Sequence, residues 1–545
     1  MVLKRNELLL LTNVLLVSSY SYANEIVISE NITSSVIWTA DNTYNLQDQI
    51  YVLPGATLTI EAGTRIASTP TASGSGSLAV CRGGKIFANG TAENPIVFTS
   101  TEDNGEWRES ANEWGNLTLM GNAYISNSFA EGNSNDFGNN QYIMEGLVQE
   151  FPGDSRALYG GQDDEDSSGS LSYVSIRYGG RVVGLSNELN GLSLGGIGRG
   201  TDINHIEIMN NVDDGIEIWG GTVNLSHVNI WNVGDDSLDI DQGWRGSAQY
   251  GLIVQGFSLD ASQGSGVGDN MVEMDGAENS DAQPVTTAQI SNFTMIGQPI
   301  DGDGATVWRD GARVQFNQCI IMDCGEKVVR PDGDDGDGSS GYGHNGTLTL
   351  AEVFQTPYTY SSNSLYTAQV SGTLSGINDS VLYNNSNYSD FNTLNGERDN
   401  RIEPNNSPIV SIVREVPRIR GGKIQQRVLS IDPRAASGAS RNANGANGLN
   451  GFVEEASFRG AFAEDSIWLC GWTAADQYGF IATDEYCKVD ESCYGDFNKD
   501  NFVNGSDLGL LLVGWGQPGP SDLNEDGTTN DIDLGLLLAS FGACS

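Results

Sequence analysis

The chain has 545 residues, of which 38% are apolar and 18% charged, so it is long enough to bury a large core. Its 71 acidic and 27 basic residues give a formal net charge of -44, which would repel nucleic acid and anionic membrane surfaces and makes cations the natural partners. The 69 glycines favour an all-β or solenoid body, because tight turns use glycine at positive φ.

The first 23 residues are typical of a signal peptide. Lys4 and Arg5 precede an apolar run from Leu8 to Val17, and the small-residue region ends at Ala23. This run is too short for a membrane helix, and no later stretch is long enough to cross a bilayer. We therefore expect cleavage near Ala23 and a secreted or extracellular protein, with attachment to the cell surface left open.

Short strands are predicted through much of the chain. Apolar and polar residues alternate between Gly, Pro and Asn turns in IYVLPGATLTIEAGTRI, SLAVCRGGKIFANG and NPIVFTS. A repeat follows, in which HIEIMNNVDDGIEI from His205 aligns without gaps with HVNIWNVGDDSLDI from His227, and DNMVEM from Asp269 repeats its acidic end. A period near 22 residues predicts an all-β, right-handed parallel β-helix, whose coils bury their inner faces against one another.

Several strings taken together resemble a family of exported bacterial β-helix proteins. They are the run from Ile50 to Ser100, then NELNGLSLGGIGRGT, DDGIEIWGGTVN and DDSLDIDQGW, and finally FRGAFAEDSIWLCGWTA. The resemblance covers most of residues 35–480 and implies the fold and secretion, but no settled activity. We expect a signal peptide (1–23), the β-helix (24–420), a capping or linker region (421–490) and a separate tail (491–545).

The repeat aligns acidic residues on successive coils. Asp213 matches Asp235 and Glu217 matches Asp239, and coils stacked at strand spacing would bring such pairs about 4.8 Å apart. Because the alternation turns Ile216 inward, Glu217 should face outward. Like charges at this spacing are unfavourable unless they bind a cation or hold protons. The candidate catalytic or ligand-binding residues are Asp213, Asp214, Glu217, Asp235, Asp236, Asp239 and Glu273.

Three interpretations of this acidic column stay open. Paired carboxylates can hydrolyse a glycosidic bond, one as acid and the other as base or nucleophile. The column can also bind a glycan without cutting it, with Trp219, Trp231 and Trp244 as candidate sugar platforms. No complete signature of a pectin-degrading family is recognisable and no elimination base can be picked out. Whether the protein is an enzyme, a polysaccharide hydrolase or lyase, is therefore undecided.

The third interpretation is a structural or calcium-stabilising role. Asn210 aligns with Asn232 as in a stacked amide ladder, and Asp-Asp at a turn caps local amides. His205 over His227 would then be a pair of stacked surface residues.

The segments after the repeat are less regular. Residues 332–347 and 436–450 are rich in Gly, Ser, Asn and Asp and are predicted to be surface loops or linkers, while Phe452–Ile481 is apolar enough to cap or close the solenoid. None of the spacings of the seven cysteines is typical of a zinc site, and Cys81 is interpreted as a small strand residue. The candidate disulfides are Cys470 with Cys487, Cys319 with Cys324, and Cys493 with Cys544.

The tail contains two related segments, GDFNKDNFVNGSDLGLLL and SDLNEDGTTNDIDLGLLL, each with a twelve-residue loop before an apolar helix. Calcium takes about six to eight oxygen ligands, and alternate residues of a tight loop aim such oxygens inward. The predicted calcium ligands are Asp496, Asn498, Asp500, the Phe502 carbonyl, Asn504 and Asp507 in the first loop, and Asp522, Asn524, Asp526, the Thr528 carbonyl, Asn530 and Asp533 in the second.

This duplicated loop–helix form resembles a type I dockerin, an α-helical calcium-binding module that binds cohesin domains. The resemblance implies a calcium-dependent fold for residues 494–545 and a cohesin-like partner. Gly505 and Ser506 differ from Asp531 and Ile532 at the positions that read the partner, so its identity stays open.

Two functions follow from the sequence. One is a secreted, carbohydrate-directed protein that binds or degrades a polysaccharide and is delivered by its dockerin-like tail. The alternative is a non-catalytic extracellular protein of a surface, a matrix or an adhesin type.

Overall fold

The computed structural model describes residues 24–545 except 72–75, 127–139, 148–153, 181, 185–186, 257–267, 277–283, 285, 309–311, 332–376, 384–398, 404, 421, 437, 444–451, 483–484, 488–494, 499–501, 518–520, 522, 524–527 and 544–545. The signal-peptide prediction for residues 1–23 and the loop prediction for residues 332–347 therefore lie outside the described residues.

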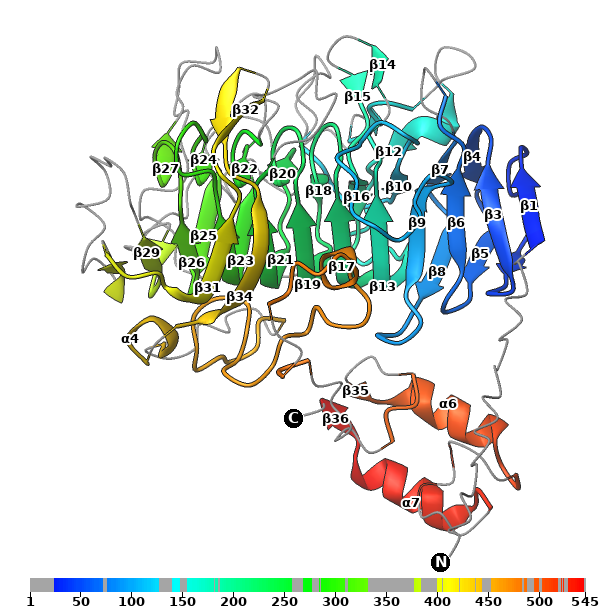
Figure 1. Cartoon of the computed structure of the whole chain (residues 1–545). Helices are drawn as coiled ribbons and strands as arrows, with labels where there is room; N and C mark the ends of the chain where they lie inside the picture. Colours follow the sequence, from blue (N-terminus) through cyan, green and yellow to red (C-terminus); the bar gives the residue numbers. More distant parts are fainter. Residues whose placement is uncertain are drawn as a thin grey trace, which may run out of the picture.

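Two long parallel sheets run the length of the molecule (Figure 1). Strands of successive coils lie side by side, so that Ile206 pairs with Val228 in one sheet and Ile216 with Leu238 in the other. Both pairs have the 22-residue offset of the repeat. The prediction of a parallel β-helix is confirmed.

Sheet A contains one or two strands from each coil. Its strands are β1 (Asn24–Ile28), β2 (Val36–Trp38), β3 (Asn42–Leu46), β5 (Thr57–Ile60), β6 (Arg65–Ser68), β8 (Lys85–Asn89), β9 (Ile96–Ser100), β13 (Gly169–Arg177), β17 (Asp202–Met209), β19 (Asn224–Trp231), β21 (Ser247–Val254), β23 (Thr287–Ile296), β25 (Arg313–Asn317), β26 (Ile320–Met322), β28 (Ile377–Asn378), β29 (Val381–Tyr383) and β30 (Arg401–Glu403).

Sheet B lies behind sheet A and has one strand from each coil that contributes to it. Its strands are β4 (Gln49–Val52), β7 (Ser77–Val80), β10 (Leu117–Met120), β16 (Leu192–Ile197), β18 (Ile216–Gly221), β20 (Leu238–Asp241), β22 (Val272–Met274), β24 (Thr306–Trp308) and β27 (Val329–Pro331).

Side chains from both sheets meet in one elongated core. Leu192, Ile216, Leu238 and Val272 occupy the same position on four successive coils and are fully buried. Burial of each such side chain contributes roughly 1.5–3 kcal/mol. The period-2 alternation of the sequence thus gives each coil an inner face that its neighbours cover.

A column of left-handed residues bends the long strands of sheet A at equivalent positions. Its members, with φ between 50° and 61°, are Tyr173, His205, His227, Tyr250 and Asn292. A side chain at such a φ costs on the order of 1–2 kcal/mol. Stacking between coils offsets this cost, since the ring centroids of His205 lie 4.1 Å from those of Tyr173 and 4.2 Å from those of His227.

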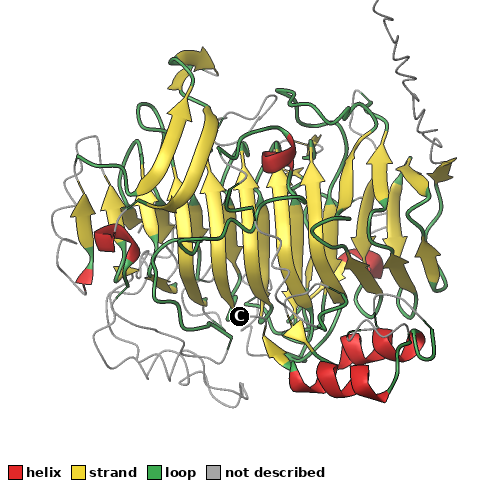
Figure 2. Cartoon of the chain, turned by 60° about the horizontal axis from the view of Figure 1, so that its bottom comes forward, coloured by secondary structure: helices red, strands yellow, loops and turns green. Residues whose placement is uncertain are grey.

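The outer face of sheet A is covered by the segment after the last coil (Figures 1 and 2). Ile431 and Phe480 pack there against Met209, Trp231 and Leu252. The region expected to cap or close the solenoid therefore lies along its side. The elements of this cover are the antiparallel pair β31 (Ile409–Arg414) and β34 (Val428–Ala435), the hairpin β32 (Arg418–Arg420) and β33 (Lys423–Gln425), and the short helices α4 (Gly438–Arg441) and α5 (Ala474–Gln477).

An excursion between β10 and β13 covers the outer face of sheet B. It contains β11 (Tyr142–Ile143), a 3-10 turn (Ser155–Ala157) and β12 (Leu158–Tyr159), and β14 (Val182–Gly184) pairs with β15 (Asn187–Glu188) nearby in sequence. Met144 and Tyr159 of the excursion pack against Met120 and Trp219 of sheet B.

The cysteine predictions have mixed outcomes. Cys470 and Cys487 form a disulfide, as predicted. The predicted bond between Cys319 and Cys324 is wrong, because both side chains are packed in the solenoid core and no disulfide joins them. Cys81 is buried beside sheet B, and the predicted pair of Cys493 and Cys544 lies outside the described residues.

The tail forms two nine-residue helices, α6 (Gly505–Val513) and α7 (Asp531–Ala539), and the short pair β35 (Phe502–Val503) and β36 (Gly542–Ala543). Each helix follows its predicted loop. Within the part of the chain that the structure describes, every helix is too short or too polar to span a bilayer.

Candidate functional site

The acidic column predicted from the repeat exists. Glu217 in β18 pairs with Asp239 in β20, and Asp239 pairs with Glu273 in β22. The core contacts of Ile216 place Glu217 on the outer side of sheet B, as expected. Carboxylate oxygens of Asp213, Asp214 and Asp235 lie within 4.8 Å of one another at the preceding turn.

We call the full set the acidic ladder, because it climbs three coils and the beginning of a fourth. Its members share the turn before sheet B or the first outward position of a sheet B strand. They are Asp213, Asp214, Glu217, Asp235, Asp236, Asp239, Asp269, Glu273 and Asp303.

One row of the ladder is tied to the backbone of the next coil. The amide of Asp236 donates to Asp214 Oδ1 over 2.9 Å, and the amide of Asn270 donates to Asp236 Oδ1 over 2.6 Å. An equivalent bond is present one coil earlier, where the amide of Asp214 donates to Asn190 Oδ1. Asp214 and Asp236 therefore cap the turns, as the structural interpretation expected.

The two ends of this row differ from its middle. Nδ2 of Asn190 donates to Glu217, and Nδ2 of Asn270 donates to Glu273 Oε2 over 3.2 Å. At the middle coils the row carries a carboxylate instead of an amide. Oxygens of Asp214, Glu217 and Asp239 consequently lie within 4.8 Å of one another, and so do those of Asp235, Asp236 and Asp269.

Burial and this crowding raise the pKa values of four ladder residues. Burial is the main cause and adjacent carboxylates add to it, so the pKa values of Asp214, Glu217 and Asp236 lie well above their usual range. The same causes raise the pKa of Asp235 to about 8. Near neutral pH the ladder therefore holds protons or requires a cation.

The spacing distinguishes between the interpretations of the sequence. Calcium–oxygen bonds of about 2.3–2.6 Å place two ligands of one ion at most about 5 Å apart, which the three carboxylate groups satisfy. Carboxyl pairs of glycosidases lie about 5–5.5 Å apart in retaining and about 6.5–9.5 Å apart in inverting enzymes. Neighbouring carboxylates of each group are thus arranged for a shared cation or proton more than for sugar hydrolysis.

The expected sugar platforms are wrong. Trp231 and Trp244 are 1% and 0% exposed, and Trp219 is 6% exposed. Trp244 lies in the solenoid core, Trp231 lies beneath the cover on sheet A, and Tyr159 of the excursion packs against Trp219. Segments distant in sequence therefore bury Trp231 and Trp219, which the repeat alone would leave exposed.

The histidine pair is stacked but is not a surface pair, contrary to expectation. Trp468 and Trp472 of the cover pack edge-on against the two rings, and His205 is only 3% exposed. Burial lowers the pKa of His227 to about 4 and that of His205 well below its usual value, so both rings are neutral at physiological pH. The expected amide ladder is present, since Asn232 Nδ2 donates to Asn210 Oδ1.

Sequence reasoning missed a basic residue at the ladder. Lys423 in the β32–β33 hairpin places Nζ 2.7 Å from Asp303 Oδ2, and the amide of Ile424 donates to Asp301 Oδ2 over 2.6 Å. The two partners are 120 positions apart, so no local pattern could reveal the contact.

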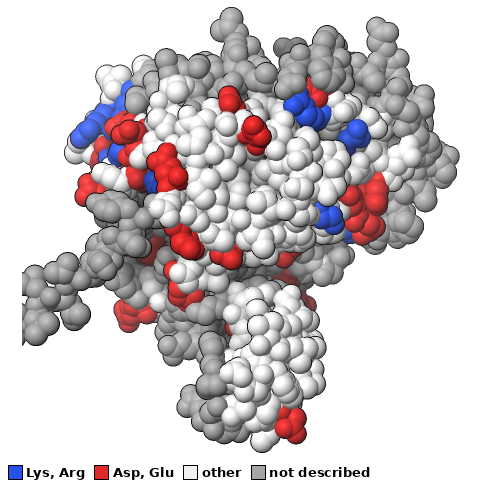
Figure 3. Space-filling model, turned by 90° about the vertical axis from the view of Figure 1, so that its right-hand side faces the viewer, with Lys and Arg blue, Asp and Glu red and all other residues white. Residues whose placement is uncertain are grey.

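Acidic side chains do not dominate every surface: the end of the solenoid that carries β1 shows them as separate groups (Figure 3).

The two predicted calcium loops share one local geometry. Asn504 and Asn530 cap α6 and α7 with nearly identical backbone angles, and Asp507 and Asp533 complete each cap as fully buried side chains. Asp507 also accepts from the amides of Phe497 and Asn498, at 2.8 and 3.1 Å.

The other predicted ligands are distributed as follows. Asp496, Asn498, Phe502 and Thr528 are described and belong to the same loops, whereas Asp500, Asp522, Asn524 and Asp526 lie outside the described residues. Oxygen donors are the chemistry that calcium requires, so the described residues fit the ion.

Comparison with known proteins follows the same division of the chain. A family model described as a pectate-lyase-like β-helix domain matches residues 30–393, about two thirds of the sequence. The chain belongs to this family. The match to the pectate-lyase-like β-helix domain spans the coils that carry the ladder and stops before the cover and the tail. No curated protein and no solved structure matched the sequence.

Proposed function

We propose that the protein is exported and carbohydrate-directed, that its β-helix binds or degrades a polysaccharide, and that its tail attaches it to a partner through calcium. The observation that carries the proposal is the acidic ladder on a pectate-lyase-like β-helix. A cation held by the ladder would bring positive charge to this face, and an acidic polysaccharide needs such a charge to approach a chain of net charge -44.

The test compares the parent with Asp235→Asn plus Asp236→Asn on a panel of acidic and neutral polysaccharides. New reducing ends would indicate hydrolysis and unsaturated products would indicate elimination, while retention on immobilised glycan reports binding alone. A matched control is Asp41→Asn plus Asp48→Asn, which removes two exposed acids from the first coils. We expect the ladder variant, but not the control, to lose glycan retention or product formation. Equal behaviour of the two variants in every assay would contradict a role for the ladder.

The second candidate function is a non-catalytic surface, matrix or adhesin-like protein. The carboxylate spacing within 4.8 Å favours it, because shared cations or protons stabilise a solenoid without any chemistry on a glycan. In that case the ladder variant changes calcium affinity and thermal stability, while no polysaccharide is retained or cut.

The proposed tail is a dockerin-like module that binds calcium through its two loops. The tail leaves several large apolar side chains exposed on its helices and just after them, namely Leu512, Val513, Trp515, Ile532, Leu538 and Phe541. A protein partner such as a cohesin-like domain would cover them. Calorimetric titration of cohesin domains into the full chain should show binding with calcium and none with chelator.

The proposal of export has its own test. Mass spectrometry of the protein recovered from the medium should show an N-terminus near Asn24, and an intact Met1 on that material would contradict the cleavage.

A further inference from the structure

The cover on sheet A hides a surface that a soluble β-helix does not leave exposed. Met209, Trp231 and Leu252 point outward from β17, β19 and β21, and each is at most 1% exposed because the cover packs over it. Without the cover these three coils would present a contiguous apolar face to water.

One buried carboxylate is among the polar contacts that hold the cover on the solenoid, together with bonds such as those from Arg177 to Gln477 and from Tyr178 to Tyr478. Glu207 of β17 is 0% exposed and accepts from the amides of both Ala474 and Ala475 at the start of α5, the latter over 3.0 Å. Ser175 and Asn229, on the two adjacent coils, also donate to Glu207. Undocking of α5 would remove the two amide donors and leave Glu207 with fewer hydrogen bonds, which makes this carboxylate an attachment point for α5.

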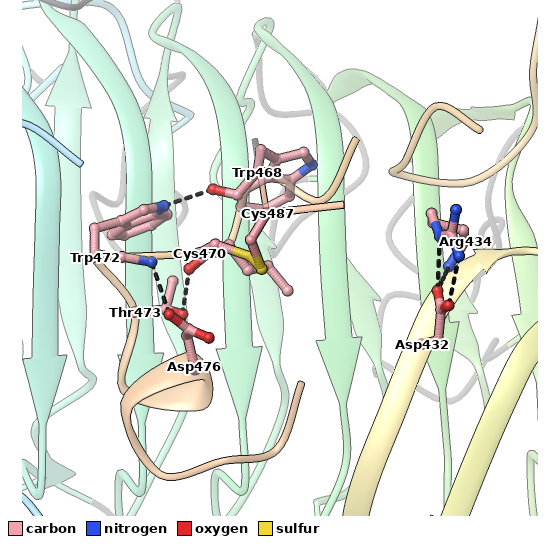
Figure 4. The surroundings of a disulfide bond; sticks show 10 residues. Asp432, Arg434, Trp468, Cys470, Trp472, Thr473, Asp476 and Cys487 are labelled. Carbon is pink, nitrogen blue, oxygen red and sulfur yellow. Dashed lines mark hydrogen bonds and ion pairs between the residues drawn. A yellow bond between two sulfur atoms is a disulfide. The ribbon is translucent and has the colours of Figure 1, made fainter. Parts of the chain in front are cut away.

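A disulfide closes the chain around this attachment. Cys470 and Cys487 flank α5, and the amide of Gly471 donates to Asp476 Oδ2 over 2.7 Å within the closed loop (Figure 4). Both cysteines are half-buried, so a thiolate in solution can reach the bond. Burial raises the pKa values of the Cys81 and Cys319 thiols to about 12, which leaves these two thiols unreactive.

We propose that the Cys470–Cys487 bond and Glu207 form a redox-sensitive clasp that holds the cover on sheet A. In the reduced chain α5 undocks from Glu207 and the apolar face of β17, β19 and β21 becomes accessible. In the oxidised chain the loop is closed and the face is sealed. The clasp would keep the cover undocked in a reducing compartment and lock it in an oxidising one. That setting rests on the proposed export, whereas the clasp itself does not.

The redox step exchanges two electrons. A dithiol attacks one sulfur of the bond as its thiolate, a mixed disulfide forms, and the second thiol of the reagent releases it as a cyclic disulfide. Cys470 and Cys487 each end as a thiol, so the two electrons and two protons come from the reagent.

Hydrogen exchange of the full chain tests the clasp. With a dithiol, and equally in Cys470→Ser plus Cys487→Ser, we expect the amides of residues 472–482 to exchange at least about tenfold faster. Amides of β17 and β19 should not change, and binding of an apolar dye should rise. Unchanged exchange at residues 472–482 would overturn the proposal. So would faster exchange of β17 and β19 to the same degree, because the bond would then support the whole fold instead of a local clasp.

Glu207→Gln separates the carboxylate from the bond. It keeps the shape of the side chain and one acceptor oxygen, so we expect the amides of Ala474 and Ala475 to exchange faster even with the disulfide intact. The matched control is Glu464→Gln, which removes the same charge from a 71% exposed side chain in the cover. Equal exchange in the two variants would overturn the role of Glu207. Glycan assays are not needed for any of these outcomes, so failure of the clasp and failure of the proposed function are distinguishable.

Discussion

The coils and the tail both contain repeats rich in acidic residues, but they differ in the size of the core that stabilises them. In the coils, neighbouring strands bury an apolar column that runs from β1 to β30, and backbone amides hold Asp214 and Asp236. In the tail, the fully buried apolar side chains of the described residues are only Val503, Leu511 and Leu537. The described part of the tail thus has a much smaller core than the coils, and we expect its fold to need an additional source of stability.

The largest expected effect is the loss of calcium. Chelation should unfold residues 494–545 while the β-helix still unfolds in a separate transition, because ten side-chain oxygen ligands in two loops repel one another without the ion. Calcium at a thousand times its Kd would stabilise the tail by about 4 kcal/mol. Calorimetry of the full chain with calcium and with chelator measures the difference. Asp496→Ala plus Asp522→Ala should reproduce the chelated state, and equal stability of this variant and the parent in calcium would count against the loops as ion sites.

Truncation of one apolar side chain in each region should destabilise the coils more than the tail. Ile218→Ala removes a fully buried side chain between Leu194 and Ile240 of the adjacent coils and should destabilise the β-helix by about 2–5 kcal/mol. Leu512→Ala in the tail removes a side chain that is 54% exposed and should change stability by less than about 0.5 kcal/mol. Chemical denaturation measures both. A larger loss for Leu512→Ala would mean that the apolar surface of α6 is covered within the chain.

The parts of the structure that the sequence predicts are those that repeat. The pairing of Glu217 with Asp239 follows from the 22-residue offset alone, because stacked coils transmit the alignment directly into strand register. The hydrogen bonds of Asn190 and Asn270 to the acidic row are harder to predict. Their coils lack the Asp-Asp pair, and they lie 24 and 34 positions from the residues they bond in the adjacent coils instead of 22.

Burial by distant segments could not be predicted. The alternation places Trp231 on the outer face of its coil, and docking of the cover hides it, with Phe480 stacked on its ring although the two residues are about 250 positions apart. The contact between Lys423 and Asp303 has the same origin. A repeat determines what faces its neighbours, and irregular segments determine what faces solvent.

The pH dependence of the coils should report the ladder. The folded-state pKa of Asp235 is raised from a usual value near 3.8 to about 8, so the folded chain holds a proton that the unfolded chain has lost over this range. Its contribution to stability is therefore fully present below the lower value and lost as the pH rises through the upper one. With chelator, the melting temperature of the β-helix should fall by a few degrees between pH 5 and pH 8.

Added calcium and substitution of Asp235 test whether the ladder causes this decline of stability with pH. An ion bound to the ladder stabilises the charged carboxylates, so added calcium should flatten the decline. Asp235→Asn should also reduce it, while Asp41→Asn, in an exposed position, should leave it unchanged. An equally steep decline in Asp235→Asn would show that other groups produce it.

A smaller loss of stability than that of Ile218→Ala is expected at the turn just before the acidic row. Asn232 has φ of 54°, and its side chain donates to Asn210 over 3.4 Å, so both its conformation and its hydrogen bond contribute. Asn232→Ala loses the bond and keeps a Cβ at a left-handed position, which should cost about 1–2 kcal/mol. Asn232→Gly loses the same bond but adopts this φ without strain, so it should cost less than alanine even though glycine is more flexible when unfolded. Thermal unfolding of the two variants separates the contribution of the hydrogen bond from that of the backbone conformation. If glycine were as destabilising as alanine, the amide ladder and not the backbone conformation would hold the coils together at this turn.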